Sequence, residues 1–153
     1  MATSTLIQRL PSAGDITFTD RGESHRRQVE TFLAAGAIAA GDAVSLDCAK
    51  AQMAEKMIFV ASADTGAQTT KAFVGIALEA ATAVGQRIRV VTAGLALANV
   101  AAGNAASPGI HMMISTGGDL VDYNAGSVLQ NAAISLEARN GDGQANVIVW
   151  KQF

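Results

Sequence analysis

The stretch FVGIALEAATAVGQRIRVVTAG, residues 73–94, decides how we interpret this chain of 153 residues. It begins with an apolar run, turns near Gly85, and then alternates charged with apolar residues at 87–90. Alternation with a period of two is typical of a half-buried strand. The stretch therefore predicts two strands joined by a turn, and Gly94 is expected to end this unit.

The same pattern returns 58 positions later, near the C-terminus. The sequence ISLEA at 134–138 matches IALEA at 76–80, and Gly-Gln at 143–144 matches Gly-Gln at 85–86. The shared strand–turn–strand pattern predicts an internal repeat, in which two similar halves close on one another. After one inserted residue, Val147 and Val149 are expected to take the places of Ile88 and Val90.

Composition and charge exclude several classes of protein. Half of the residues are hydrophobic, but only 5% are aromatic, and many of the rest are alanines that bury little apolar area. A core of this kind gains from burial in an oligomer. The net charge of −2 provides neither a basic field for nucleic acid nor a polybasic membrane anchor. No apolar run reaches membrane-spanning length and no signal peptide is recognisable, so we expect synthesis in a cytoplasm.

Short predicted strands separated by turns follow one another along most of the chain. Such a pattern indicates a mainly β fold, either a small barrel or a sandwich. Residues 47–56 are expected to form a polar connection, and residues 95–100 a short strand or a helical turn. Residues 31–46 are expected to form a strand, a turn at Gly41 and a second strand at 43–46, and the other predicted strands are residues 16–19, 57–61, 110–114, 120–123 and 147–150.

The first 31 residues differ from the rest of the chain. Their charges are mixed in sign, and Pro11, Gly14 and Gly22 interrupt any regular element. We expect residues 1–31 to form an extended N-terminal arm that a partner orders, with a disordered terminus as the alternative. Residues 32–153 are expected to form a single β-domain.

No catalytic, cofactor-binding or metal-binding set is predicted. His111 stands in an apolar strand, which favours a packed or interface residue over a general base. Cys48, the only cysteine, has no histidine nearby in the sequence and is expected to be a buried or idle thiol. Glu79 and Glu137 occupy equivalent places in the repeat, and charges at strand ends explain them better than a paired-carboxylate site does. We therefore expect a protein that is not an enzyme.

The order of the motifs adds a family resemblance. A Gly-Asp-x-Val turn and strand at 41–44 precedes Val-Gly-Ile-Ala at 74–77 and Gly-x-x-Ile-x-Val at 85–90. A second round ends in the sequence VIVW at 147–150. From about Thr31 to the C-terminus, this order resembles the capsid cement, or head decoration, proteins of tailed bacteriophages.

The resemblance implies a structural protein with a small barrel or β-tulip-like core. It would bind the outer surface of the phage major capsid protein lattice as a homotrimer and would stabilise the head against the pressure of packaged DNA. The implied location is the outside of the virion capsid, with no direct contact to nucleic acid or membrane and no cofactor. The residues expected to contact the capsid lie in the arm and are Arg9, Phe18, Arg21, Arg26 and Arg27.

Two other functions stay open. A binding module on the virion surface, for carbohydrate or receptor, would show exposed aromatic side chains, and Tyr123 and Trp150 are few for that purpose. A small β-clip enzyme domain, which the sequence AIAAGDAVSL at 37–46 resembles faintly, would need a polar constellation around its best residue, His111.

Overall fold

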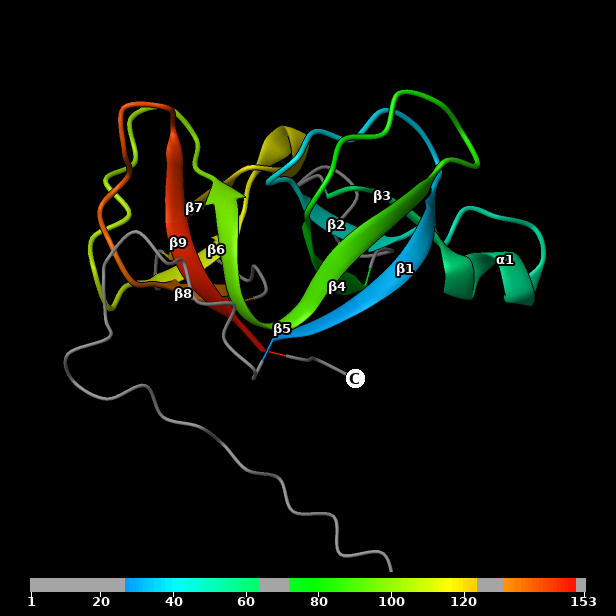
Figure 1. Cartoon of the computed structure of the whole chain (residues 1–153), viewed down its shortest axis with the longest axis horizontal. Coiled ribbons are helices and arrows are strands. Elements are labelled where there is room, and N and C mark those ends of the chain that lie inside the picture. Colours follow the sequence, from blue (N-terminus) through cyan, green and yellow to red (C-terminus); the bar gives the residue numbers. More distant parts are fainter. Residues whose placement is uncertain (1–26, 64–71, 124–130, 151–153) are drawn as a thin grey trace, which may run out of the picture.

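The computed structural model describes residues 27–63, 72–123 and 131–150. These residues form two β-rich lobes that lie side by side (Figure 1). The elements are β1 (Gln28–Ala34), β2 (Ala43–Leu46), α1 (Met53–Ile58), β3 (Phe59–Ser62), β4 (Phe73–Ala77), β5 (Arg87–Asn99), β6 (His111–Ile114), η2 (Thr116–Gly118), β7 (Leu120–Asp122), β8 (Asn131–Ser135) and β9 (Gln144–Val149).

The first lobe, which we call half 1, is a closed five-stranded barrel. Its strands follow the order β1-β3-β2-β4-β5, and antiparallel pairing of β1 with the first part of β5 closes the ring. Phe32, Val44, Val60, Ile88 and Val90 are buried in its interior cluster. The predicted small β-barrel is therefore confirmed.

The second lobe, half 2, begins in the same strand that completes half 1. Strand β5 continues past Gly94, whose φ of 95° lets the backbone bend without ending the strand. The residues after this bend pair with β9, and the order continues through β8 and β6 to β7. The predictions that Gly94 ends the unit and that 95–100 form a separate element were wrong. One isolated bridge, between Val100 and Leu120, brings β7 back to the end of β5.

The pairing register shows that the internal repeat extends over both lobes. Each strand of half 1 has a counterpart in half 2. The second part of β5 corresponds to β1, and β6, β7, β8 and β9 correspond in turn to β2, β3, β4 and the first part of β5. Both halves also carry an irregularity at the same place, after Val44 in β2 and after Met112 in β6. The residue pair Leu33–Arg87 of half 1 corresponds to Asn99–Gln144 of half 2. In the same way, Ala43–Ile76 corresponds to His111–Ile134, and Leu46–Val60 corresponds to Ile114–Leu120.

One detail of the predicted repeat was wrong. Ala77 pairs with Val90 in half 1, and its counterpart Ser135 pairs with Val147 in half 2. Val147 is therefore the counterpart of Val90, and the second hairpin is one residue shorter than the first, not longer. Turns absorb changes of length, whereas the side-chain period of two fixes the register of the strands.

A second difference lies between β2 and β3. The predicted strand 57–61 begins only at Phe59, because Met57 and Ile58 end the short helix α1. Ala, Glu, Lys and Met are good helix formers, and α1 contains no buried residue, so local preference prevails there. Strand β2 has its predicted bounds, whereas β1 takes in residues 28–31 of the expected arm and β9 begins at Gln144. The predicted strand 16–19 lies outside the described residues.

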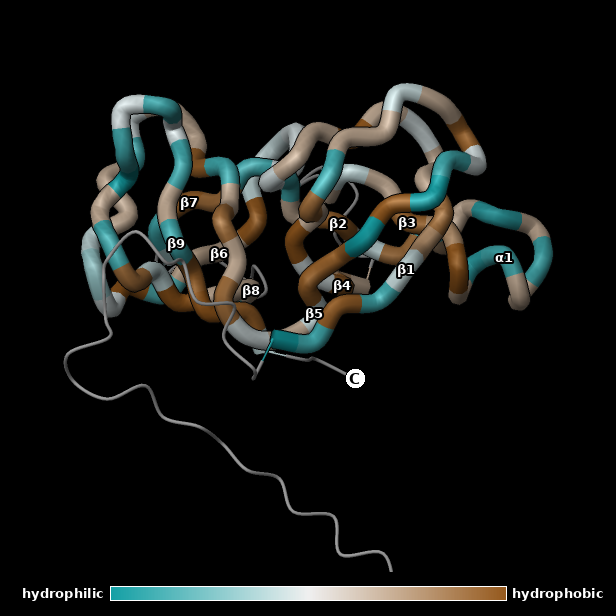
Figure 2. The backbone as a smooth tube through the Cα atoms, in the orientation of Figure 1, coloured by the Kyte–Doolittle hydropathy of each residue, from teal (hydrophilic) through white to brown (hydrophobic). Residues whose placement is uncertain are grey.

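The two halves share one continuous core. Ala43, Ile76 and Val91 point out of the half 1 barrel, yet they belong to the same buried cluster as Met112 and Leu120 of half 2. Hydrophobic residues are concentrated in the strands of both lobes (Figure 2). The outer side of half 1 that meets half 2 is therefore removed from water along with the barrel interior.

Candidate interaction surfaces

The equivalent glutamates Glu79 and Glu137 have the same structural task in their own halves. The Glu79 Oε1 atom accepts hydrogen bonds from the backbone N–H and the Nε of Arg89, at 2.8 and 3.1 Å. The Glu137 Oε1 atom accepts from the backbone N–H and the Nδ2 of Asn146, at 3.0 and 2.8 Å. The backbone hydrogen bond from Arg89 is the main reason why the pKa of Glu79 is lowered. Each carboxylate therefore ties its own hairpin together.

Removing these carboxylates is expected to destabilise both hairpins. Glu137→Ala leaves the Asn146 amide without its partner and is expected to cost about 1 kcal/mol, with a smaller cost for the more exposed Glu79→Ala. Because the pKa of Glu79 is lowered on folding, its contribution is present above the ordinary carboxyl pKa and disappears as the pH falls through the folded value. Urea unfolding at neutral and acidic pH checks both expectations. Glutamine at either position keeps an acceptor oxygen and serves as the control.

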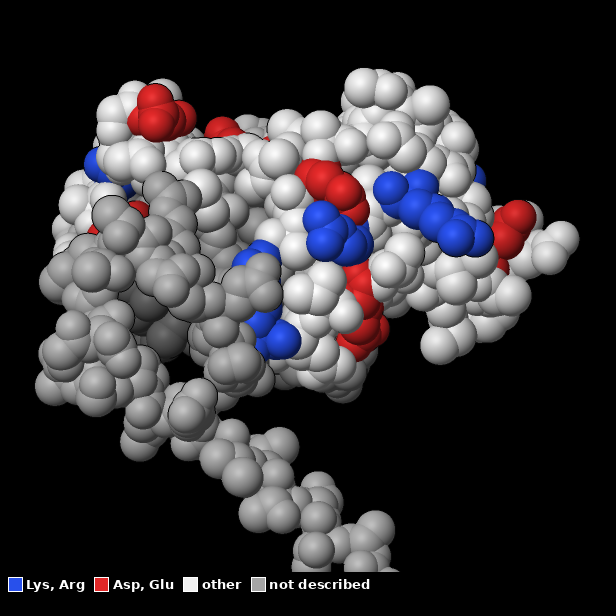
Figure 3. Space-filling model, in the orientation of Figure 1, with Lys and Arg blue, Asp and Glu red and all other residues white. Residues whose placement is uncertain are grey.

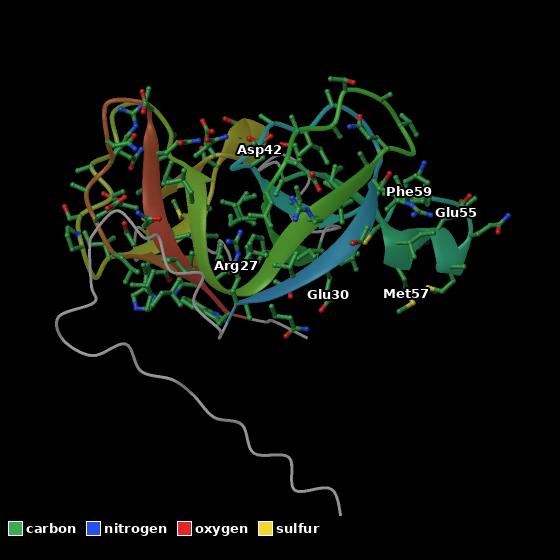
Figure 4. The ribbon with its side chains drawn as sticks, viewed as in Figure 1. Arg27, Glu30, Asp42, Glu55, Met57 and Phe59 are labelled. Carbon is green, nitrogen blue, oxygen red and sulfur yellow. The ribbon has the colours of Figure 1, made fainter. Side chains whose placement is uncertain are left out.

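A chain of polar side chains spans the junction of the halves. Asp42, which Figure 4 shows at this junction, accepts hydrogen bonds from the Ala39 backbone N–H at 2.8 Å and from Asn99 Nδ2 at 2.9 Å. Gln144 Nε2 donates to Asn99 Oδ1, also at 2.9 Å. Asp119 lies near this network, and burial, followed by the charge of Asp42, raises its pKa. The network satisfies buried polar groups and so has a structural role.

Replacing Asp119 by asparagine is expected to stabilise the protein near neutral pH. The raised pKa means that the folded state disfavours the charged form, and this cost appears as the pH rises through the folded pKa. Asp119→Asn removes the cost, and we expect a gain of roughly 0.5 kcal/mol at pH 7 and none below the ordinary carboxyl pKa. Urea unfolding at both pH values measures this difference. Asp142→Asn, at an exposed turn, is the control, and a loss of stability at pH 7 would refute the expectation.

The candidate reactive side chains are not assembled into a site. His111 is exposed on β6, where it contacts Asn131 through Nδ1 and lies in a T-shaped arrangement with the Trp150 ring, so it is not packed in the core, and its role at an interface stays a prediction. Cys48 is a free, half-buried thiol. Within the described ranges, no group of three His, Cys, Asp or Glu residues is arranged to hold a metal ion. The described helices also include none that is long and apolar enough to cross a membrane.

The structure describes one of the five residues expected to contact a capsid. Arg27 lies just before β1, near the junction of the halves (Figure 4). It is half-buried, and its Nε has no contact with solvent and no hydrogen-bond partner among the described residues. Arg9, Phe18, Arg21 and Arg26 lie outside the described residues.

The body of the protein exposes two apolar surfaces, and neither of them was predicted from the sequence. Helix α1 exposes Met53 and Met57, whose exposed fractions are 72% and 66%. The second surface lies on the outer side of half 2, where the strand pattern indicated apolar residues but not which of them face water. We call it the half 2 outer face, and it consists of Leu95, Leu97, His111, Ile134, Leu136 and Ile148.

Charged side chains are distributed differently over the two halves. On the side of the molecule seen in Figure 3, basic and acidic groups lie over β1 and β5 of half 1. The outward positions of β6, β8, β9 and the second part of β5 include no Lys, Arg, Asp or Glu. An uncharged outer surface of this kind is typical of a surface that is covered in the functional state.

Comparisons with known proteins relate the fold to a solved phage protein structure. No family model matches the sequence, and no curated protein sequence is significantly similar to it. The chain is similar in structure to the head fiber gp8.5 N base of bacteriophage phi29, with a TM-score of 0.56 and 11% sequence identity. The match covers 80% of this chain and 93% of that chain. At this identity the likeness establishes a shared fold.

Proposed function

We propose that this protein is a structural component of a phage head, a capsid cement protein that binds the outside of the major capsid protein lattice. The observation that carries the proposal is the fold, which is shared over most of its length with the base of a phage head fiber. The motif order of the sequence points to the same class of protein independently. Function is set by surfaces and not by the fold alone, so the proposal depends on binding experiments.

The surfaces of the protein fit this role. The apolar side of α1, with Met53 and Met57 exposed, is suited to contacts with other protein surfaces. Arginines of the arm, Arg9, Arg21 and Arg26, are suited to ion pairs with capsid carboxylates. A homotrimer would engage three capsid sites at once, so individually weak contacts would give strong attachment.

The homotrimer gives the first testable expectation. Light scattering behind a sizing column is expected to show a mass of about three times 15.6 kDa. Burial between subunits would compensate for a core in which many buried side chains are alanines. A monomer at all accessible concentrations would contradict trimer formation in solution.

Binding to capsids tests the function itself. Expanded, DNA-free capsids of the phage that encodes the chain are mixed with the protein and sedimented. We expect saturable binding with a fixed number of copies per capsid, and unexpanded shells serve as the comparison. Absence of binding to both, together with recognition of a glycan on an array, would favour the virion-surface binding module instead.

A further inference from the structure

The internal repeat makes one unusual feature of half 2 visible. In half 1, the row Ala43–Ile76–Val91 runs across β2, β4 and β5, and all three residues are completely buried. The corresponding row in half 2 is His111–Ile134–Ile148, across β6, β8 and β9. There His111 and Ile148 are exposed and Ile134 is half-buried. The same surface is thus covered in one copy of the repeat and open in the other.

The open row has stayed mostly apolar, although His111 replaces Ala43. Ile134 and Ile148 are as apolar as their counterparts, and Leu95, which pairs with Ile148, extends the row onto β5. Terminal units of stacked repeats normally carry a polar outer surface, because nothing covers them. An apolar outer face at the end of this repeat therefore indicates an occupant.

We propose that residues 1–26 of the same chain bind the half 2 outer face, with Ile16 and Phe18 as the anchoring side chains. The position of β1 supports this assignment. Gln28 pairs with Ala93, and the adjoining residues Gly94 and Leu95 pair with Val149 and Ile148. The arm therefore joins the body at the edge of the half 2 outer face. At this point Arg27, the first described residue, is half-buried.

Length and size agree with this occupant. The face extends over β5, β9, β8 and β6, a width of about 15 Å at the usual strand spacing. The chain from Gln28 back to Phe18 spans about 30 Å when extended, so both anchors reach every strand of the face. The six residues of the half 2 outer face cover a surface area on the order of 300 Å². This area suits a short extended segment and is well below the ~800 Å² that each partner buries in a stable subunit interface.

The chemistry of the arm agrees as well. In an extended segment Ile16 and Phe18 point to one side, and Thr17 and Thr19 point to the other. The apolar side can meet the uncharged face while the arginines stay in water. This arrangement gives Phe18 a role on the protein's own surface and leaves Arg9, Arg21 and Arg26 for the capsid.

Disulfide trapping in the full chain, without capsids, tests the proposal. In a Cys48→Ser background, Phe18→Cys is combined in turn with Leu97→Cys, Ile134→Cys or Ile148→Cys, and with Met57→Cys on α1 as the control. We expect oxidation to give an intrachain disulfide with at least one position of the face and none with α1. Disulfides that link two chains would assign the face to a second copy, and absence of any disulfide with the face would equally overturn the proposal.

The only tryptophan supplies a second readout that needs no cysteine. Trp150 follows β9, lies two residues after Ile148 and contacts His111. In the double variant Ile16→Ser and Phe18→Ser, acrylamide should quench Trp150 fluorescence roughly twice as strongly as in the native protein, because the covering side chains are lost. Met53→Ser on α1 should leave the quenching unchanged. Equal quenching in the double variant and the native protein would contradict coverage by the arm.

Discussion

Replacing Gly75 by alanine is expected to unfold half 1. A Cβ atom at this position of β4 would overlap the backbone oxygen of Val91 and would lie 2.8 Å from its carbonyl carbon. The obstacle is the backbone of the neighbouring strand, so no rotation of a side chain relieves it. We expect a loss of at least about 3 kcal/mol and a fall of Tm by roughly 10 °C or more.

A matched control is available in the same half. Gly36 has nothing within 4 Å of the position of a Cβ atom, so Gly36→Ala is expected to change the stability by less than about 0.5 kcal/mol. Thermal unfolding followed by far-UV circular dichroism compares the two variants. A Gly75→Ala variant that melts within a few degrees of the native protein would refute the close strand approach.

The repeat shows that this glycine is specific to half 1. In register, the counterpart of Gly75 is Ala133, which pairs with Met112 as Gly75 pairs with Val44. Among the described residues, a single bridge between Val100 and Leu120 closes the ring of half 2, whereas paired strands close half 1 on both sides of β1. At Gly75 of half 1, β4 and β5 lie so close together that a methyl group has no space.

Reversing the charge of three arm arginines is expected to abolish tight capsid binding. The triple variant Arg9→Glu, Arg21→Glu and Arg26→Glu replaces attraction to capsid carboxylates by repulsion. A single exposed ion pair contributes only a few tenths of a kcal/mol to about 1 kcal/mol of binding free energy. Because the three arms of a trimer bind together, the losses from all three arms combine and the total affinity falls steeply. We expect an affinity at least about 100-fold lower, and a native affinity that weakens with rising salt.

The control for this variant carries a charge change on the body. Arg87 is exposed at the start of β5, and Arg87→Glu is expected to retain most of the affinity. The Tm of the triple variant should remain close to the native value, because none of its positions belongs to the described core. Unchanged affinity of the triple variant would exclude the arm as the attachment segment, whatever the fate of the fold.

Local patterns in the sequence predicted the strands well where apolar residues alternate or where glycine marks a turn. The bounds of β2 follow from Gly41 and the run after it, and the repeat follows from IALEA and ISLEA. The sequence failed at Gly94, because a glycine at positive φ can bend a strand as well as end it. It failed at Met57 and Ile58 because a short apolar run such as MIFVA at 57–61 is compatible with both helix and strand.

The surfaces were harder to predict than the strands. Residues 147–149 are apolar at every position, so their pattern does not show that Val147 and Val149 face inward and Ile148 outward. The exposure of Ile148 and Ile134 follows only from the way that the halves pack. Which copy of the repeat is covered is a tertiary property, and no local pattern encodes it.

A cryo-electron microscopy reconstruction of expanded capsids saturated with the protein tests the central claim most directly. We predict added density on the outer capsid surface at local three-fold positions, with three copies of the protein at each position. Capsids without added density, or density confined to the tail vertex or to the inner surface, would contradict the role as a cement protein.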